Sequence, residues 1–70
     1  MDRRRFDYTA TADGHKDQSF TSDVAYQAGD ELPLGNGRWT VTEVEDVGWN
    51  RWDENREETI LSRRLHCTVA

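Results

Sequence analysis

The chain has 70 residues, of which 34% are hydrophobic and 33% are charged, and its formal net charge is −5. A chain this short forms one small domain over residues 1–70, and it leaves little room for the dry cleft that a reactive site needs. The acidic balance argues against tight nonspecific binding to nucleic acid or to anionic membranes, because both are negatively charged.

Residues 4–12 alternate between apolar and polar side chains, which predicts a first strand with one buried face. That face carries Phe6, Tyr8, Ala10 and Ala12. The following Asp13-Gly14 indicates a turn, and the length of the turn decides the register of the next strand. A two-residue turn would put Phe20 on the wrong face, whereas an odd loop of three or five residues pairs Phe20 with Tyr8. We therefore predict an odd loop.

A second strand is predicted over residues 18–26. Its apolar side carries Phe20, Val24 and Tyr26. Residues 28–30, with the sequence Ala-Gly-Asp, indicate the next turn, and residues 31–34 then form a short third strand. Pro33 cannot donate a ladder hydrogen bond, so we expect this strand at an edge of the sheet.

Residues 30–45 carry the clearest hairpin signal of the chain. Asn36 and Gly37 both tolerate the positive φ that a type I′ turn requires. A two-residue loop at this point places four apolar side chains on one face of the hairpin, which makes Trp39 a core residue. The predicted pairs are Leu34 with Trp39 and Leu32 with Val41.

The apolar phase slips after Val41, because Val44 is an odd number of residues away. A bulge near residues 42–43 would restore the phase, and a bend there would let one strand serve both halves of a barrel. The alternative is a strand that is exposed on both faces beyond Thr42.

Residues 48–58 show no regular apolar spacing, and we predict a long loop there. The alternative is a helix over residues 50–65 with Asn50 as its cap. Nothing apolar lies between Trp52 and Ile60, however, so the helical pattern is poor.

The last predicted strand covers residues 59–69, in which Arg63 interrupts the apolar side and Ile60 lies on the other face. Its apolar side carries Leu61, Leu65, Cys67 and Val69. The sequence thus predicts an all-β fold of five strands in a small, partly open barrel with one long loop before the last strand. The short strands, the Gly-Asp turn, the tight hairpin and the bent fourth strand resemble an SH3-like barrel.

We predict no catalytic residues, no cofactor and no metal site. His66 and Cys67 are neighbours in a strand, so their side chains point to opposite faces and cannot share an ion. Cys67 falls on the core face, where a thiol lacks the activation that a nucleophile needs. The carboxylates of residues 53–58 lie in a solvated loop beside arginines. The expectation is therefore a protein that is not an enzyme.

Two tryptophans in the predicted loop suggest a protein-docking surface, because exposed aromatic and arginine side chains are enriched at interfaces. The residues of this hypothesis are Trp49, Arg51, Trp52 and Arg56. The acidic residues Glu54, Glu57 and Glu58 would steer a basic partner toward the loop. The alternative for either tryptophan is to fold back and plug an open end of the barrel.

Nucleic-acid binding is the alternative function. If the first and last strands pair antiparallel, five basic side chains come together on one face of the barrel. They are Arg3, Arg4, Arg5, Arg63 and Arg64. These charges could equally protect the terminal strands from edge-to-edge aggregation.

The expected location is the cytoplasm. One cysteine permits no internal disulfide, and no apolar run is long enough for a signal peptide or a membrane span. We expect an unidentified protein partner, no membrane contact, and a monomer or a weak homo-oligomer that forms through an open edge strand.

Overall fold

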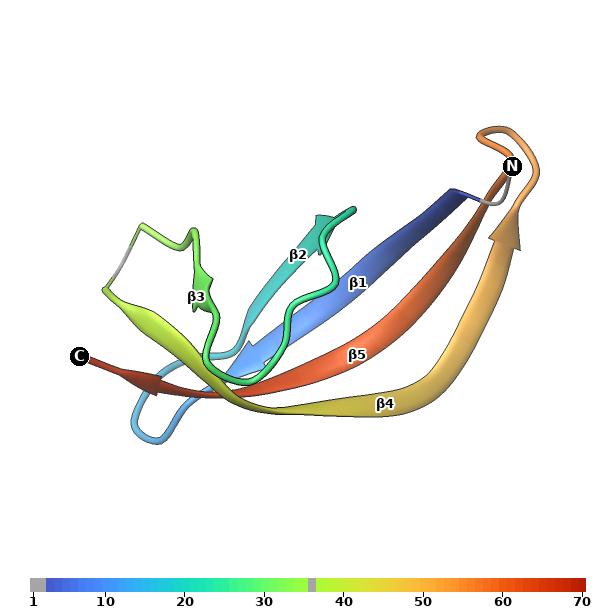
Figure 1. Ribbon diagram of the computed structural model, residues 1–70. Coiled ribbons are helices and arrows are strands. Elements are labelled where there is room, and N and C mark those ends of the chain that lie inside the picture. The colour runs from blue at the N-terminus through green and yellow to red at the C-terminus, as the bar shows by residue number, and fades with distance from the viewer. Residues whose placement is uncertain (1–2, 36) are drawn as a thin grey trace.

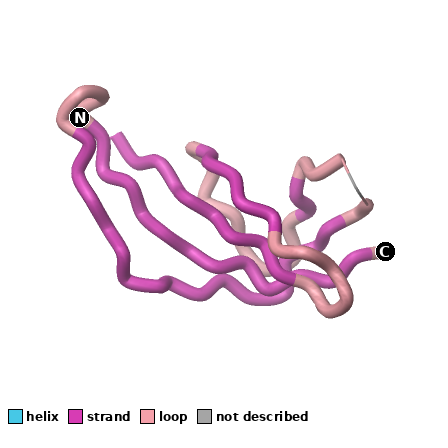
Figure 2. Tube along the Cα trace, turned by 180° about the vertical axis from the view of Figure 1, so that it is seen from behind, coloured by secondary structure: helices cyan, strands magenta, loops and turns pink. Residues whose placement is uncertain are grey.

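The computed structural model describes residues 3–35 and 37–70, apart from the side chain of Trp49. Within this part of the chain the all-β prediction is confirmed, and Figure 2 shows strands and loops with no helix. The five strands are β1 (Arg3–Thr11), β2 (Gln18–Ser22), β3 (Glu31–Leu32), β4 (Trp39–Asp53) and β5 (Glu58–Val69).

The five strands form one sheet in the order β2-β1-β5-β4-β3, and the sheet curls into a half-barrel (Figure 1). The partly open, five-stranded barrel is therefore confirmed. The terminal strands β1 and β5 are neighbours, but they pair in parallel, with Arg3 opposite Glu58 and Tyr8 opposite Arg63. The prediction that these two strands pair antiparallel, on which the nucleic-acid alternative depends, is therefore wrong.

One face of the sheet carries a cluster of buried side chains, and we call it the inner face. The cluster consists of Phe6, Tyr8, Ala10, Leu32, Trp39, Val41, Leu65 and Cys67. Aromatic rings fill much of it, since the Tyr8 ring lies 5.5 Å from the Phe6 ring and 5.3 Å from the Phe20 ring. Trp39 has no exposed surface, so its predicted place in the core is confirmed. Large aromatic areas of this kind let a short chain bury a sufficient core.

The register between β1 and β2 follows the predicted parity, because Tyr8 pairs with Phe20. The last residue pair between the two strands is Ala10 with Gln18. Residues 11–17 lie between these two positions, so the connection has an odd length, as predicted, but is longer than the predicted three or five residues. Within it the amide of His15 donates to the carbonyl oxygen of Ala12 at 3.1 Å, and Gly14 adopts a φ of 75°. A positive φ at the third position of a turn favours glycine.

The second strand ends at Ser22, four residues earlier than predicted. The Ser22 hydroxyl accepts a hydrogen bond from the Val24 amide at 3.1 Å, which turns the chain away from β1. Val24 is therefore not on a buried strand face, and 47% of its surface is exposed. Tyr26 still packs against the core, as predicted.

The predicted hairpin pairs are wrong in register. Leu32 pairs with Trp39, and Glu31 pairs with Thr40, a shift of two residues from the predicted pairing. The strand stops at Leu32 because Pro33 has no amide hydrogen to donate. A shift of two residues keeps every side chain on its face, so Leu34 still packs against the core. Asn36, and with it the predicted type I′ turn, lies outside the described residues.

The predicted bulge in β4 is confirmed, because the register with β5 shifts between Val41 and Glu43. A second shift lies between Asp46 and Asn50. There Gly48 adopts a φ of 77°, and its amide donates to Asp46 Oδ1 at 2.9 Å. Bulges bend a strand, and the two shifts account for the curved path of β4 in Figure 1.

The predicted long loop over residues 48–58 is wrong. β4 continues to Asp53 and pairs with β5, and residues 54–57 form the turn between the two strands. The Asp53 carboxylate closes this turn by accepting hydrogen bonds from the amides of Asn55 at 3.0 Å and Arg56 at 3.4 Å. Such carboxylate-to-backbone bonds favour turns.

A three-stranded ribbon extends from the core and ends at this turn (Figure 1). It consists of residues 3–6 of β1, residues 50–53 of β4 and residues 58–61 of β5, and we call it, with the turn, the arm. The molecule measures 38 × 20 × 19 Å, so the arm contributes to an elongated shape.

Candidate functional site

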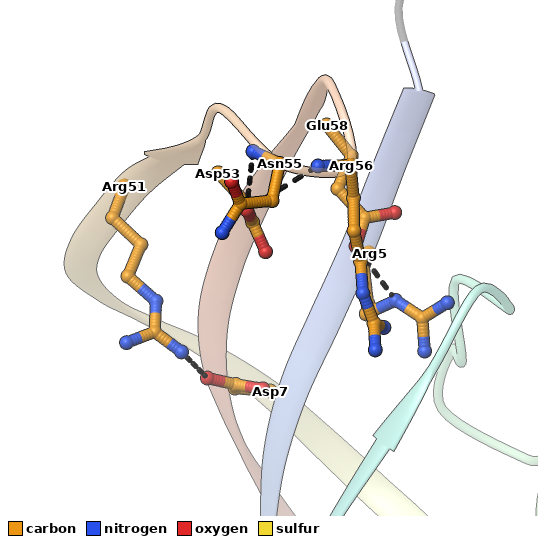
Figure 3. A network of polar contacts seen from close by, with 7 residues as sticks. All are labelled: Arg5, Asp7, Arg51, Asp53, Asn55, Arg56 and Glu58. Atoms are coloured by element: carbon orange, nitrogen blue, oxygen red, sulfur yellow. Dashed lines mark hydrogen bonds and ion pairs between the residues drawn. The ribbon is translucent and has the colours of Figure 1, made fainter.

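We call the face of the sheet opposite to the inner face the outer face. Two ion pairs lie on the outer face of the arm (Figure 3). Arg5 Nε lies 3.1 Å from Glu58 Oε1, and Arg51 Nη2 lies 3.3 Å from Asp7 Oδ2. The second pair joins β4 to β1 across the intervening β5. Ile60 lies on this face, as predicted, and only 7% of its surface is exposed.

The two ion pairs differ in strength because they differ in burial. The Glu58 side chain is 8% exposed, and a buried carboxylate is costly without a partner such as Arg5. The side chains of Arg51 and Asp7 are 69% and 34% exposed, so solvent screens their attraction. The Arg5–Glu58 pair therefore contributes more to holding β1 against β5 than the Arg51–Asp7 pair contributes to holding β4 near β1.

The inner face of the arm carries apolar surface that continues from the core. Phe6 is buried, and its partner on β5, Leu61, packs against the core cluster. Trp52 pairs with Thr59, two residues before Leu61 on β5, so Trp52 lies on this same face. Its surface is 56% exposed. The apolar surface of the inner face therefore ends at the exposed indole of Trp52 on β4.

Arg63 lies between the core and the arm, on the inner face. It is the β5 partner of the buried Tyr8. Its guanidinium carbon lies 4.9 Å from the centre of the Phe6 ring, within the range of a cation–π contact. The Nε atom of Arg63 is buried and has no hydrogen-bond partner among the described residues. The inner face therefore combines exposed apolar surface with one unpaired basic group.

The structure does not bring the predicted docking residues onto one surface. Trp49 lies in β4, and its side chain is outside the described part of the structure. Arg51 lies on the outer face, opposite Trp52, because neighbours in a strand alternate. Arg56 lies in the turn at the tip of the arm. Trp52 is exposed, so it does not plug the barrel.

The five arginines of the nucleic-acid alternative are also separated. Because β1 and β5 run in parallel, Arg3 pairs with Glu58, and Arg63 lies five positions further along. That separation is about 16 Å at the usual rise of a strand. Arg63 and Arg64 occupy opposite faces, and Arg5 is already paired with Glu58. No continuous basic stripe forms from these residues.

An open hollow of about 610 Å³ lies over β2, β1 and β5, and both polar and apolar residues line it. Its lining includes the side chains of Thr9, Ser19, Thr21 and Ser62. The lining holds no histidine, and its carboxylate, that of Asp7, is paired with Arg51 rather than with one of these hydroxyls, so none of them has a partner in the lining that would activate it as a nucleophile. Among the residues that the structure describes, no group of three His, Cys, Asp or Glu side chains could hold a metal ion.

Cys67 and His66 lie on opposite faces, as predicted. Cys67 is part of the core cluster, and burial raises the pKa of its thiol above the ordinary value of 9.0. Less of the reactive thiolate is therefore present near neutral pH. His66 Nε2 lies 3.2 Å from Glu45 Oε1 on the outer side of the sheet.

Sequence reasoning missed the roles of Arg63 and Glu58. The available signal for Arg63 was its parity, because it falls on the same side of β5 as Leu61 and Leu65. Glu58 was assigned to a loop as a steering charge, but it begins β5 and is buried against Arg5.

The chain matches no protein-family model, no curated protein and no solved structure. In the two described stretches, no helix has the length and apolar character that crossing a membrane requires. Function is therefore inferred from the geometry of the arm and its surroundings.

Proposed function

We propose that this protein is a small, non-enzymatic interaction or regulatory module that binds another protein through the inner face of the arm. The observation that supports this most is Trp52, whose surface is 56% exposed although it lies on β4, which pairs with β5 here and is joined to β1 by the Arg51–Asp7 ion pair. Of the four contact residues predicted from the sequence, this proposal keeps Trp52, together with the residues beside it on the inner face of the arm.

A rigid, exposed tryptophan suits protein binding for two reasons. Its indole buries a large area when a partner covers it, and few rotatable bonds must be fixed. Tryptophan and arginine are also the residue types that most often dominate the energy of an interface. Trp52 and Arg63 supply one of each on the same face.

The non-enzymatic assignment is supported by Cys67, which is buried in the core with a raised pKa. We further propose an SH3-like arrangement of the half-barrel, a cytoplasmic location, and a monomer or weak homo-oligomer. The location rests on the single cysteine, which forms no internal disulfide.

Affinity capture from an extract of the source cells tests this function. The immobilised full chain is compared with Trp52→Ala and with Arg64→Gln, which changes an exposed residue on the outer face. We expect Trp52→Ala to reduce retention of the bound protein by at least about tenfold, as at an interface hot spot. Arg64→Gln should retain it. Equal retention by the wild type and Trp52→Ala, with both folded by circular dichroism, would contradict the proposal.

A further inference from the structure

Arg63 occupies a position at which the pattern of β5 calls for an apolar side chain. Leu61 and Leu65 flank it on the inner face, and Tyr8 pairs with it on β1. A charged group on a buried face is costly unless it is paired. The cation–π contact with Phe6 compensates part of this cost, but it satisfies none of the N–H donors of the guanidinium.

The described part of the protein supplies no anion for Arg63. The ion pairs formed there involve other arginines or His66, and Arg63 Nε is buried without an acceptor. Asp46 is its pairing partner on β4, but the two side chains form no ion pair, and Asp46 Oδ1 accepts the Gly48 amide at 2.9 Å. Arg63 as a whole is only half-buried, and its other guanidinium nitrogens also form no hydrogen bond or ion pair with the described residues, so an anion from outside the chain would pair with those nitrogens.

The ligand of this site needs an apolar part as well as an anionic part. The exposed indole of Trp52 lies on the same face as Arg63. One guanidinium fits one planar carboxylate through paired hydrogen bonds. A run of phosphates would need further basic groups nearby, and Arg64 points to the opposite face.

The strand geometry sets the distance between the two parts. Trp52 pairs with Thr59, and Arg63 lies four residues beyond Thr59 on β5. Four residues of a strand span about 13 Å and return the side chains to the same face. An extended peptide has the same rise, so its residues i and i+4 match the spacing of Trp52 and Arg63.

We propose that the inner face of the arm binds an extended, acidic segment of a partner protein. In that segment a carboxylate pairs with Arg63, and an apolar side chain four residues away packs against Trp52. This inference rests on the proposed function and specifies its partner. It differs from the basic partner that Glu54, Glu57 and Glu58 suggested in the sequence; of these three carboxylates, Glu58 is paired with Arg5.

Selection from random peptides tests the inference. A library of linear 12-residue peptides displayed on phage is panned against the immobilised full chain, with Trp52→Ala used for counter-selection. The enriched peptides are then synthesised, and their dissociation constants are measured by fluorescence anisotropy. The variants are Arg63→Gln and, as the matched control, Arg64→Gln, which removes the same charge from the outer face.

We expect the enriched peptides to carry Asp or Glu four residues from a large apolar side chain. Arg63→Gln should weaken their binding by about tenfold or more, and Arg64→Gln by less than about twofold. Replacing the peptide carboxylate by its amide should cost a similar factor with the wild type and little with Arg63→Gln. This peptide-side change keeps the test valid even if Arg63→Gln destabilises the fold.

Two other outcomes overturn the inference in distinguishable ways. Peptides that require Trp52 but neither an acidic residue nor Arg63 would leave the proposed function standing and contradict the acidic partner. Peptides that are no more enriched on the wild type than on Trp52→Ala would contradict both proposals.

Discussion

The backbone amide of Tyr26 donates a hydrogen bond to the side-chain oxygen of Tyr8 at 3.0 Å, and the two rings meet edge to face at 5.4 Å. The same Tyr8 hydroxyl donates its proton to the carbonyl oxygen of Val24 at 2.6 Å. Residues 23–27 belong to no strand, so Tyr8 supplies hydrogen bonds that a ladder would otherwise provide. One side chain of β1 thereby holds the segment that follows β2 over the core.

Tyr8→Phe should lower the free energy of unfolding by about 1–3 kcal/mol, because it leaves the Tyr26 amide and the Val24 carbonyl without their partner. Urea unfolding measures the loss. Hydrogen exchange should show the Tyr26 amide losing protection while amides in β5 keep theirs. Unchanged protection at Tyr26 would show that this hydrogen bond does not hold the segment.

Stability should fall at alkaline pH. Burial raises the pKa of Tyr8 above 10.0, although the hydrogen bond from the Tyr26 amide and the charge of Arg63 oppose the rise. The unfolded chain loses this proton near pH 10 while the folded chain keeps it, so the unfolded form is favoured as the pH rises above 10. The contribution is complete below that pH and is lost as the pH rises through the folded pKa.

Unfolding free energies of Tyr8→Phe and the wild type, measured between pH 8 and pH 11, check this expectation. The decline of the variant above pH 10 should be shallower. The raised pKa of Cys67 adds a decline from about pH 9 in both proteins, so a Cys67→Ala background separates the two groups. Parallel curves in that background would exclude Tyr8 as the source.

Arg5→Gln should be more destabilising than Arg3→Gln. The first change leaves the buried carboxylate of Glu58 without its cation, at a cost of about 1–3 kcal/mol for a partly exposed pair. The second change affects an exposed side chain and should cost less than about 0.5 kcal/mol. Thermal and urea unfolding measure both values, and equal losses would contradict the stabilising role of the pair.

Glu57→Asn should stabilise the arm. Glu57 adopts a φ of 52° in the turn, a conformation that side chains other than those of Asn, Asp and Gly adopt at a cost. The expected gain is up to about 1 kcal/mol in the free energy of unfolding. Glu54→Asn in the same turn is the control, and a matching gain there would point to charge removal as the cause.

The core was predictable from side-chain parity. Tyr8 and Phe20 meet because apolar residues on the two strands must share a face, and the slip between Val41 and Val44 indicates the bulge that β4 contains. These inferences need only the alternation of a strand. They hold even where the hairpin register is shifted, because Leu32 and Trp39 remain on the same face.

The arm was not predictable in the same way, because the part of β4 that belongs to it carries few apolar residues. Residues 50–53 carry only one apolar side chain, that of Trp52, so β4 beyond Gly48 has no alternating apolar pattern to detect. The opposite orientations of Arg51 and Trp52 follow only once the segment is known to be a strand. The parallel pairing of β1 with β5 depends on the path of the whole chain, which no local pattern specifies.

Site-specific photo-crosslinking in the source cells tests the central claim most directly. A benzophenone amino acid replaces Thr59, on the inner face of the arm, or Ser62, three residues along β5 on the outer face. We predict a crosslinked adduct of defined mass from position 59 and none from position 62. Adducts from position 62 alone, or equal adducts from both positions, would contradict docking through the inner face.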